Sequence, residues 1–517
     1  MQFEVHEEVS GHVGAVRALK EAGSKVVLVH DDRRLTGDEC LSIVYQVARA
    51  FTVIGVGKGS AIAMLSLNLP EAYLVQIAGQ LVGARYTPLH PMGSCEDQAY
   101  VIADAEIEFL FYDPRVFATR VAELRNSGAV GRTYALGPDG TNPDLLGLAA
   151  QQSTAPVPPA PLSGDDIETL YYTGGTTGKP KGVMQTRFGM LYTQLMFLSS
   201  ADSSSDTSRR CTLISTPISH AGGTVITPTL MQGGTVVLLD GFSAELFLRT
   251  VEREQITHAF LVPTMVYVLL DYLSAHPEID VTSLEEVGYG AAPMSPVRLA
   301  EALRRIGPVF TQGYGQTEAG PAILRLTKDD HSLERPDLLA SAGRPRLGVV
   351  AVILREDGSE ADVGEVGELC LRGPMLMKGY WKNPDATDHA FRGGWLHTDD
   401  LARRDDAGYI TIVDRRKDMI ISGGFNVYPS EVEKVLSEHP AVHMTAVVGV
   451  PDEKWGESVK AFVVLADSLS ADPEELIAYV RERKGAINTP KSVEIIETLP
   501  LTGVGKIDRK ALRANGR

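Results

Sequence analysis

The sequence predicts an α/β protein with a large N-terminal domain of layered α/β subdomains and a small C-terminal α+β domain. Helical and strand-like apolar patterns alternate over residues 1–150, which is typical of a sheet covered by helices. After about residue 400 the pattern changes to a short unit with its own helices and strands. A chain of 517 residues is long enough for two domains with separate cores.

In the first part of the chain, helices and strands are expected in alternation. Residues 41–54 have the apolar spacing of a helix, and residues 61–67 have the composition of a buried strand. A second helix at 72–84 and a second strand at 107–113 continue the pattern. Segment 155–164, APVPPAPLSG, is rich in proline and predicts a stiff connector.

Residues 55–59, GVGKG, contain part of a dinucleotide-binding fingerprint. The segment follows a predicted helix and precedes a predicted strand, which is the reverse of the order that a Rossmann turn requires. We therefore interpret it as a turn.

The C-terminal unit carries a compact set of predicted elements. These are a helix at 431–439, strands at 445–450 and 460–465, and a helix at 473–483. We place the domain boundary between residues 414 and 415, which gives domains of 1–414 and 415–517. The serine-rich segment 199–208 predicts an exposed loop.

The composition limits the classes of partner. The formal net charge of −17 argues against nucleic acid or an anionic membrane as the main partner. The four cysteines show no metal-binding spacing, which is typical of thiols in a reducing compartment. No signal peptide and no membrane-spanning apolar stretch is apparent, so we expect a cytoplasmic protein without an integral membrane segment. Oligomeric state stays open, with a homodimer as one option.

Residues 172–183, YTGGTTGKPKGV, have the composition of a phosphate-binding loop. A Walker A loop is excluded because Pro180 follows Lys179 and Thr173 stands in place of the first glycine. Extended segments at 167–173 and 182–186 flank the loop, so we expect a strand–loop–strand phosphate clamp. Glycines would let the backbone approach the anion, while hydroxyl and ammonium groups bind it.

From this loop onward the sequence resembles the adenylate-forming enzymes, which include acyl-CoA synthetases, peptide-synthetase adenylation domains and luciferases. The resemblance covers nearly the whole chain and is closest to fatty-acid or aryl-acid CoA ligases. The family's loop usually reads YTSGTTGxPKG, so Gly174 replaces a serine and one hydroxyl donor is lost. The resemblance assigns ATP binding to Thr173, Gly174, Gly175, Thr176, Thr177, Gly178, Lys179 and Lys181. It also implies that Thr176 helps to bind magnesium.

Three further motifs follow in the order of the family. LISTPISHAGG (213–223) places His220 beside the expected acyl pocket, where it is assigned a catalytic role. YGAAPMS (289–295) resembles the segment packed against adenine, and its small residues suit either a flat ring or tight packing; they are Gly290, Ala291 and Ala292. QGYGQTEAG (312–320) implies that Tyr314 stacks on adenine, Thr317 contacts the α-phosphate and Glu318 binds Mg²⁺. Gln312, Gly313 and Gly315 complete this nucleotide segment.

The last motifs lie around the domain boundary and in the C-terminal domain. WLHTDDL (395–401) implies that Asp400 accepts both ribose hydroxyls, with Asp399 where glycine is usual. By the same resemblance Arg415 and Asn426 bind the nucleotide, Lys417 is the hinge, and Gly423 and Gly424 line the thiol tunnel. Lys506, in PLTGVGKIDRKAL (500–512), matches the lysine that inserts over the active site during adenylation.

The resemblance implies a two-step ligase reaction with ATP, Mg²⁺ and coenzyme A. A small-molecule carboxylic acid attacks the α-phosphorus of ATP and expels pyrophosphate, and coenzyme A then takes the acyl group as a thioester. The family rotates its small, mobile C-terminal domain between the two steps. Catalysis would rest on positioning and electrostatics, because no GxSxG nucleophile motif is present.

Two alternatives stay open at this stage. An adenylate-forming enzyme could pass its acyl group to a carrier protein, an amine or a small inorganic nucleophile instead of coenzyme A. A catalytically silent nucleotide-binding homologue is the alternative outside enzymes, although the presence of Lys506, Glu318, Asp400 and Arg415 argues against it. The identity of the acid is not readable from the sequence.

Overall fold

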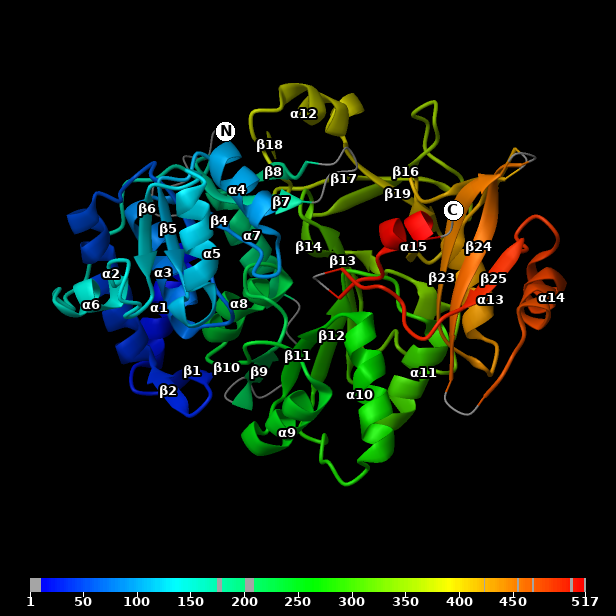
Figure 1. Ribbon diagram of the computed structural model, residues 1–517, viewed down its shortest axis with the longest axis horizontal. Helices are drawn as coiled ribbons and strands as arrows, with labels where there is room; N and C mark the ends of the chain where they lie inside the picture. The colour runs from blue at the N-terminus through cyan, green and yellow to red at the C-terminus, as the bar shows by residue number, and fades with distance from the viewer. Residues whose placement is uncertain are drawn as a thin grey trace.

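The computed structural model describes residues 11–173, 179–199, 209–422, 424–452, 455–466, 469–502 and 505–515. Over these residues the chain forms a large N-terminal domain with three sheets and a smaller C-terminal domain with one. Figure 1 shows the C-terminal domain, in orange and red, packed beside the green and yellow parts of the large domain. The predicted fold class is confirmed.

The first sheet has seven strands in the order β18-β8-β7-β4-β3-β5-β6. Its bounds are β3 (Ala61–Leu65), β4 (Arg85–Pro88), β5 (Phe109–Tyr112), β6 (Arg132–Ala135), β7 (Ile167–Thr173), β8 (Lys181–Thr186) and β18 (Gly379–Tyr380). Its helices are α2 (Gly37–Ile54), α3 (Pro70–Val82), α4 (Cys95–Asp104), α5 (Pro114–Asn126) and α6 (Leu145–Ala150). The helix–strand alternation predicted for 41–113 is therefore confirmed.

Helix α2 shows how the local sequence defines an element. Thr36 accepts a hydrogen bond from the backbone N–H of Glu39, whose carboxylate binds back to Thr36, which completes a capping box. Gly55 ends the helix with a φ of 87°, a left-handed conformation that glycine adopts readily. The GVGKG segment is thus a turn between a helix and β3, as predicted.

The second sheet has nine strands in the order β15-β14-β13-β12-β11-β9-β10-β1-β2. The strands are β1 (Val26–His30), β2 (Arg33–Thr36), β9 (Cys211–Ile214), β10 (Thr235–Leu238), β11 (His258–Leu261), β12 (Glu286–Gly290), β13 (Phe310–Gln316), β14 (Gly320–Leu326) and β15 (Arg344–Pro345). The helices are α1 (Gly11–Ala22), α7 (Arg187–Leu198), η2 (Ala221–Val225), α8 (Ile226–Met231), α9 (Ala244–Glu254), α10 (Pro263–Ala275), α11 (Pro296–Arg305) and η3 (Leu338–Ala340). Strands β9 to β13 are mutually parallel, so the loops after them meet at one edge.

A four-stranded antiparallel sheet follows in the order β16-β17-β19-β20. Its elements are β16 (Val350–Leu354), β17 (Gly367–Arg372), α12 (Pro384–Ala390), η4 (Arg392–Gly394), β19 (Leu396–Arg404) and β20 (Ile410–Arg415). Strand β20 leads directly into the C-terminal domain.

The C-terminal domain has β21 (Ile420–Ser422), β22 (Phe425–Val427), α13 (Pro429–Ser437), β23 (Val442–Asp452), β24 (Gly456–Leu465), α14 (Pro473–Lys484), β25 (Ser492–Ile495) and α15 (Arg509–Asn515). The predicted pair of helices and pair of long strands is confirmed, with ends displaced by a few residues. The segment before α15, red in Figure 1, returns toward the large domain. No helix in the described part of the chain is long and apolar enough to cross a membrane.

Candidate active site

The ends of β12 and β13 lie side by side and form the floor of the site. Gly290 pairs with Gly313 in parallel register, and a Cβ on Gly290 would lie 2.3 Å from the Gly313 carbonyl oxygen. A Cβ on Gly315 would lie 2.4 Å from the Gly320 carbonyl oxygen. Close packing of backbone therefore accounts for these glycines. Ala291, with a φ of 67°, and Ala292 continue from β12 toward the surface.

Three residues assigned to the nucleotide come together at this edge. The Tyr314 hydroxyl donates to Asp400 Oδ2 over 2.5 Å, and Arg415 Nε lies 3.2 Å from Asp400 Oδ1. Asp400 and Arg415 are paired across β19 and β20. Burial raises the pKa of the Asp400 carboxyl, and Arg415 opposes this shift. Burial also raises the pKa of Tyr314, with a further contribution from Asp400, so its hydroxyl stays a donor.

Gln312 precedes this group on β13. Its Oε1 is buried and accepts no hydrogen bond from any residue that the structure describes. Buried acceptors of this kind are uncommon in folded proteins, and they concentrate at binding sites.

The backbone explains why Asp399 stands where the family usually has glycine. Asp399 has a φ of 58°, in the left-handed region that glycine adopts most easily and that aspartate tolerates better than most residues. Its side chain is exposed, while its N–H donates to Glu368 Oε1 over 3.2 Å and its carbonyl accepts from Arg416 N over 2.9 Å. The turn therefore keeps its shape with aspartate.

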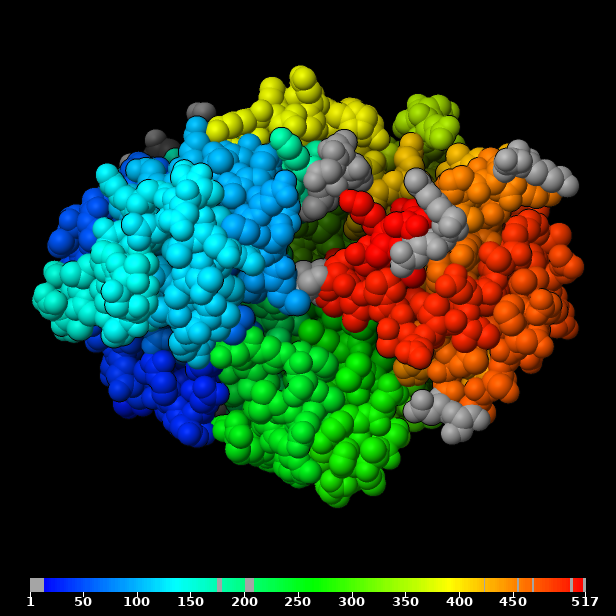
Figure 2. Space-filling model, in the orientation of Figure 1, coloured from blue at the N-terminus to red at the C-terminus, as the bar shows by residue number. Residues whose placement is uncertain are grey.

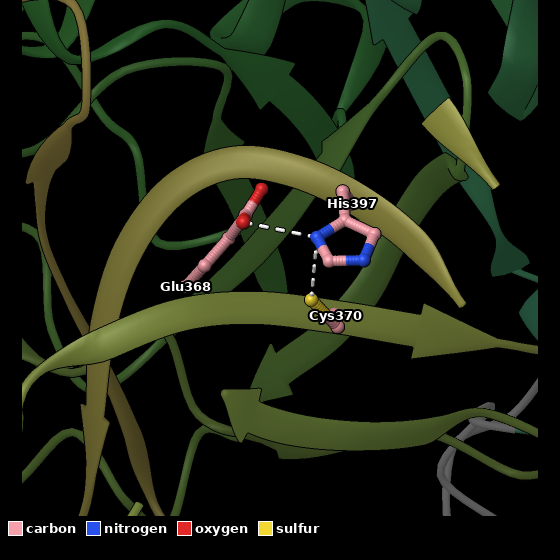
Figure 3. A group of neighbouring side chains, drawn as sticks. All are labelled: Glu368, Cys370 and His397. Atoms are coloured by element: carbon pink, nitrogen blue, oxygen red, sulfur yellow. Dashed lines mark hydrogen bonds and ion pairs between the residues drawn. The ribbon is translucent and has the colours of Figure 1, made fainter. Parts of the chain in front are cut away.

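Glu368, whose Oε1 accepts from the Asp399 N–H, forms a cluster with Cys370 and His397 (Figure 3). His397 Nδ1 lies 2.9 Å from Glu368 Oε2 and 3.3 Å from Cys370 Sγ. The same carboxylate also pairs with Arg392 and Arg416. Burial raises the pKa of the Cys370 thiol to about 12, which disfavours the thiolate that a metal needs. Because Glu368 is already neutralised by cations, this cluster supports the turn and is a poor metal centre.

Tyr380, which no sequence motif indicated, contacts both Glu318 and Lys181. The Tyr380 hydroxyl donates to Glu318 Oε1 over 3.0 Å, and Lys181 Nζ lies 4.8 Å from the centre of the Tyr380 ring. Thr317 is held nearby because Gln185 Nε2 donates to its carbonyl over 2.7 Å. Tyr380 reaches this place because β18 pairs with β8.

The phosphate loop begins and ends on the hairpin of β7 and β8, as predicted. Thr173 pairs with Lys181 across the hairpin. Lys179 Nζ instead faces the ring of Tyr100, at 5.4 Å, beside a cavity of about 180 Å³. The remaining loop residues assigned to ATP or magnesium lie outside the described residues: Gly174, Gly175, Thr176, Thr177 and Gly178.

The C-terminal segment that carries Lys506 is docked on the large domain. The Thr264 hydroxyl, in the first turn of α10, donates to the Gly505 carbonyl over 2.8 Å. Burial and the neighbouring Arg415 lower the pKa of Lys506, while Asp400 opposes them. The charges of Lys506 and the Asp400–Arg415 pair therefore act on one another. Figure 2 shows the surface hollowed where the cyan, green and red parts of the chain meet.

His220 is coupled electrostatically to Lys506. It precedes η2, and Ser219 Oγ lies 2.9 Å from its Nδ1. Burial, together with His90 and Lys506, lowers the pKa of His220 to about 4, so its imidazole is neutral near pH 7. The loop before it is anchored by the buried Asn68, whose side chain bonds Thr216 O and Ile218 N.

Three of the predicted residues lie apart from this group. Lys417, Gly424 and Asn426 are exposed around the start of the C-terminal domain, and no contact within the described residues joins them to Tyr314, Asp400 or Lys506. Gly424 has a φ of 84°. Gly423 lies outside the described residues. Within the described part of the chain, Asn426, assigned to the nucleotide, and Gly424, assigned to the thiol tunnel, thus make no contact with these three residues, whereas Lys417 follows Arg415 by two positions and the Arg415 charge, after burial, lowers its pKa.

Comparison with known proteins gives a consistent result. The family model of the AMP-binding enzyme matches residues 16–381, and that of the AMP-binding enzyme C-terminal domain matches residues 431–506. The medium/long-chain-fatty-acid–CoA ligase FadD8 of Mycobacterium tuberculosis is 45% identical, with 98% of this chain and 90% of FadD8 covered. Feruloyl-CoA synthase of an Amycolatopsis species is 38% identical over 96% of this chain and 97% of its own length.

A solved structure is also similar along its full length. The amide bond synthetase McbA from Marinactinospora thermotolerans aligns with a TM-score of 0.89 and 36% sequence identity. The alignment covers 98% of this chain and 100% of McbA.

Proposed function

The chain belongs to the AMP-binding enzymes and is an ATP-dependent carboxylate–CoA ligase, and from this premise we propose which side chains carry the reaction and which acid it activates. The enzyme converts a carboxylic acid and ATP to an acyl adenylate and pyrophosphate, and then transfers the acyl group to coenzyme A. The residue assignments rest mainly on one observation: half-buried Lys506 is coupled electrostatically to Arg415, Asp400 and His220, while Thr264 holds the neighbouring Gly505 on the large domain.

Lys506 serves the adenylation step. One oxygen of the carboxylate attacks the α-phosphorus, and the bond to the pyrophosphate oxygen breaks. Two unit charges about 4 Å apart repel by about 4 kcal/mol at an effective dielectric constant near 20, so the two anions need a cation between them. Lys506 is placed to supply this charge, and Lys181 to stabilise the departing pyrophosphate.

Tyr314, Asp400 and Arg415 bind the adenosine part of ATP. Asp400 accepts hydrogen bonds from the ribose hydroxyls, and Arg415 balances its charge. Tyr314 packs on the adenine, and Gln312, two residues earlier on β13, has a buried Oε1 without a hydrogen-bond partner among the described residues. This assignment is supported by the contacts that already join Tyr314 and Arg415 to Asp400.

Glu318 is the proposed magnesium ligand. Among the described residues, the Tyr380 hydroxyl donates a hydrogen bond to Glu318 Oε1. The second carboxylate oxygen, Oε2, is then available to bind a hard cation. A bound Mg²⁺ would neutralise phosphate charge. Lys181, Thr317 and Tyr380 would orient the same phosphate from the protein side.

The thioester step requires a second arrangement of the C-terminal domain. We assign the boundary to residues 414 and 415 and the hinge to Lys417, which is exposed and follows β20. In the new arrangement Gly424 would face the acyl adenylate in place of Lys506. Lys417→Pro restricts the backbone at the hinge and should slow thioester formation; unchanged rates of both half-reactions would contradict this assignment.

The proposed substrate is a medium- or long-chain fatty acid. The support for this choice is the 45% identity with FadD8 over 98% of the chain. The test measures pyrophosphate release from ATP with aliphatic, hydroxycinnamic and other aromatic acids, each with and without coenzyme A. Turnover that requires coenzyme A and is fastest with aliphatic acids of eight or more carbons is expected. If turnover were faster with ferulate, the proposed substrate would be an aryl acid and not a fatty acid. If turnover occurred with an added amine but not with coenzyme A, the assignment as a CoA ligase would be overturned.

A further inference from the structure

His90 follows β4, and both its ring and its backbone carbonyl accept hydrogen bonds. Its ring nitrogen Nδ1 accepts a hydrogen bond from the N–H of Met92 over 3.1 Å. Its carbonyl accepts from Gly93 N over 3.0 Å and from Gln98 Nε2 over 2.9 Å. Gln98 is held in turn by Arg120, which donates to its Oε1. The direction of the His90 ring is therefore set before any ligand binds.

These contacts also determine which ring nitrogen carries the proton. Burial lowers the pKa of His90, so the ring is neutral near pH 7 and carries a single N–H. Since Nδ1 accepts from Met92, the proton is on Nε2. This Nε2 is buried and has no hydrogen-bond partner within the part of the chain that the structure describes. A buried donor without an acceptor is uncommon in folded proteins and has room for a partner such as a water molecule or a bound ligand.

The location of His90 shows which part of the substrate it meets. Its ring lies 4.6 Å from that of His220, in an edge-to-face arrangement. His220 is close enough to Lys506 for the ammonium to lower its pKa, and Lys506 is similarly coupled to Arg415. Charge coupling thus connects Lys506 with the Asp400–Arg415 pair and with His220, and the ring of His220 contacts that of His90. The reacting carboxylate has to lie beside Lys506, one ring away from His90.

We propose that His90 is a substrate-binding residue whose Nε2–H donates a hydrogen bond to the carboxylate oxygen of the acid that does not attack ATP. This inference rests on the proposed function and adds a contact to the acid that is independent of its chain. The same oxygen becomes the carbonyl oxygen of the acyl adenylate, so the contact persists through the first half-reaction. Neutral His90 provides direction, while Lys506 provides charge.

The test compares two substitutions that differ in the donor. His90→Phe keeps a planar ring beside His220 but removes the N–H. His90→Gln places an amide N–H near the position of Nε2. The assay is acid-dependent exchange of labelled pyrophosphate into ATP, with KM for the acid and kcat measured separately on the full-length enzyme. His276→Phe is the matched control, because the ring of His276 stacks on Tyr272 in a different part of the fold.

His90→Phe is expected to lower kcat/KM for the acid about ten- to a hundredfold, which is typical of losing one hydrogen bond to a charged group. The loss should be the same for aliphatic acids and for acids with hydroxyl groups, and His90→Gln should recover most of it. His276→Phe should stay within twofold. A loss confined to hydroxylated acids, or equal losses in His90→Phe and His90→Gln with unchanged thermal unfolding, would overturn the proposal.

The His90 experiment can fail independently of the proposed function, and the two failures give different results. The exchange assay does not contain coenzyme A, so an enzyme with a different acyl acceptor would still show the His90 effect. The exchange assay also uses whichever acid gives the fastest turnover in the substrate test, so it does not depend on the acid being a fatty acid. Unchanged exchange in His90→Phe, together with normal thioester formation, would reject His90 and leave the ligase assignment intact.

Discussion

Replacing Tyr380 with phenylalanine tests how the site positions Glu318. The substitution removes the hydroxyl that donates to Glu318 Oε1 over 3.0 Å and keeps the ring that lies 4.8 Å from Lys181 Nζ. A hydrogen bond to a charged group contributes about 1.5–3 kcal/mol, and partial access of water to this side chain reduces the value to about 1–1.5 kcal/mol. Since 1.4 kcal/mol corresponds to a factor of ten, adenylation should slow about five- to tenfold.

Tyr380→Leu separates the two roles of this side chain. It also removes the ring beside Lys181, and a cation–π contact near the surface contributes about 0.5–1 kcal/mol. We therefore expect a further two- to fivefold loss. Tyr192→Phe is the matched control, because the Tyr192 hydroxyl donates to the Leu347 carbonyl at a distance from Glu318 in the fold.

The assay is pyrophosphate exchange measured over a range of Mg²⁺ concentrations. In Tyr380→Phe the half-saturating Mg²⁺ concentration should rise, while thioester formation from a supplied acyl adenylate should keep its rate. If both half-reactions slowed equally, Tyr380 would act on the fold and not through Glu318. An unchanged Mg²⁺ dependence in all three variants would refute the reasoning.

Three further predictions concern charge, backbone and pH. Lys506→Ala should lower pyrophosphate exchange by a factor of about a hundred or more, while thioester formation from supplied acyl adenylate is spared; equal loss of both steps would reject the assignment. Asp399→Gly should change the free energy of unfolding in urea by less than about 1 kcal/mol, whereas Asp399→Val should destabilise by about 1–2 kcal/mol more, because φ is 58°. The pKa of His220 is about 4 in the folded protein and about 6.5 when unfolded, so the unfolded chain binds more protons between these values and stability rises with pH there. His220→Gln should flatten the increase in stability from pH 4 to 6.5, and an unchanged slope would show that His220 is not buried in its neutral form.

Local patterns predicted much of the architecture. The helices and strands between residues 41 and 113 form as the apolar spacing indicates, and the capping box of Thr36 with Glu39 and the left-handed Gly55 define the two ends of α2. The phosphate loop was predicted as a strand–loop–strand unit, and β7 and β8 form that hairpin. Each of these signals lies within a few residues, where backbone preference and side-chain period act directly.

The order of motifs along the chain predicts residues for a nucleotide site but not the surroundings of those residues. Tyr314, Asp400 and Arg415 were named from their motifs, and the structure brings them into contact. Asp399 looked unexpected as a residue type, and its conformation became understandable only from the backbone. Its φ depends on the pairing of β19 with β20, which a sequence pattern does not report.

The sequence by itself determined the fold class, the family resemblance and the residue types of the reaction, because these depend on local periodicity and on motifs that are short and contiguous. Only the tertiary structure decided that Tyr380 meets Glu318 and that His90 meets His220. Tyr380 sits on a two-residue strand, too short for a periodic signal, and His90 lies in a loop 130 positions before its partner. Contacts of this kind arise from strand order and from loops gathered at one sheet edge, so they exist only once the whole chain has packed.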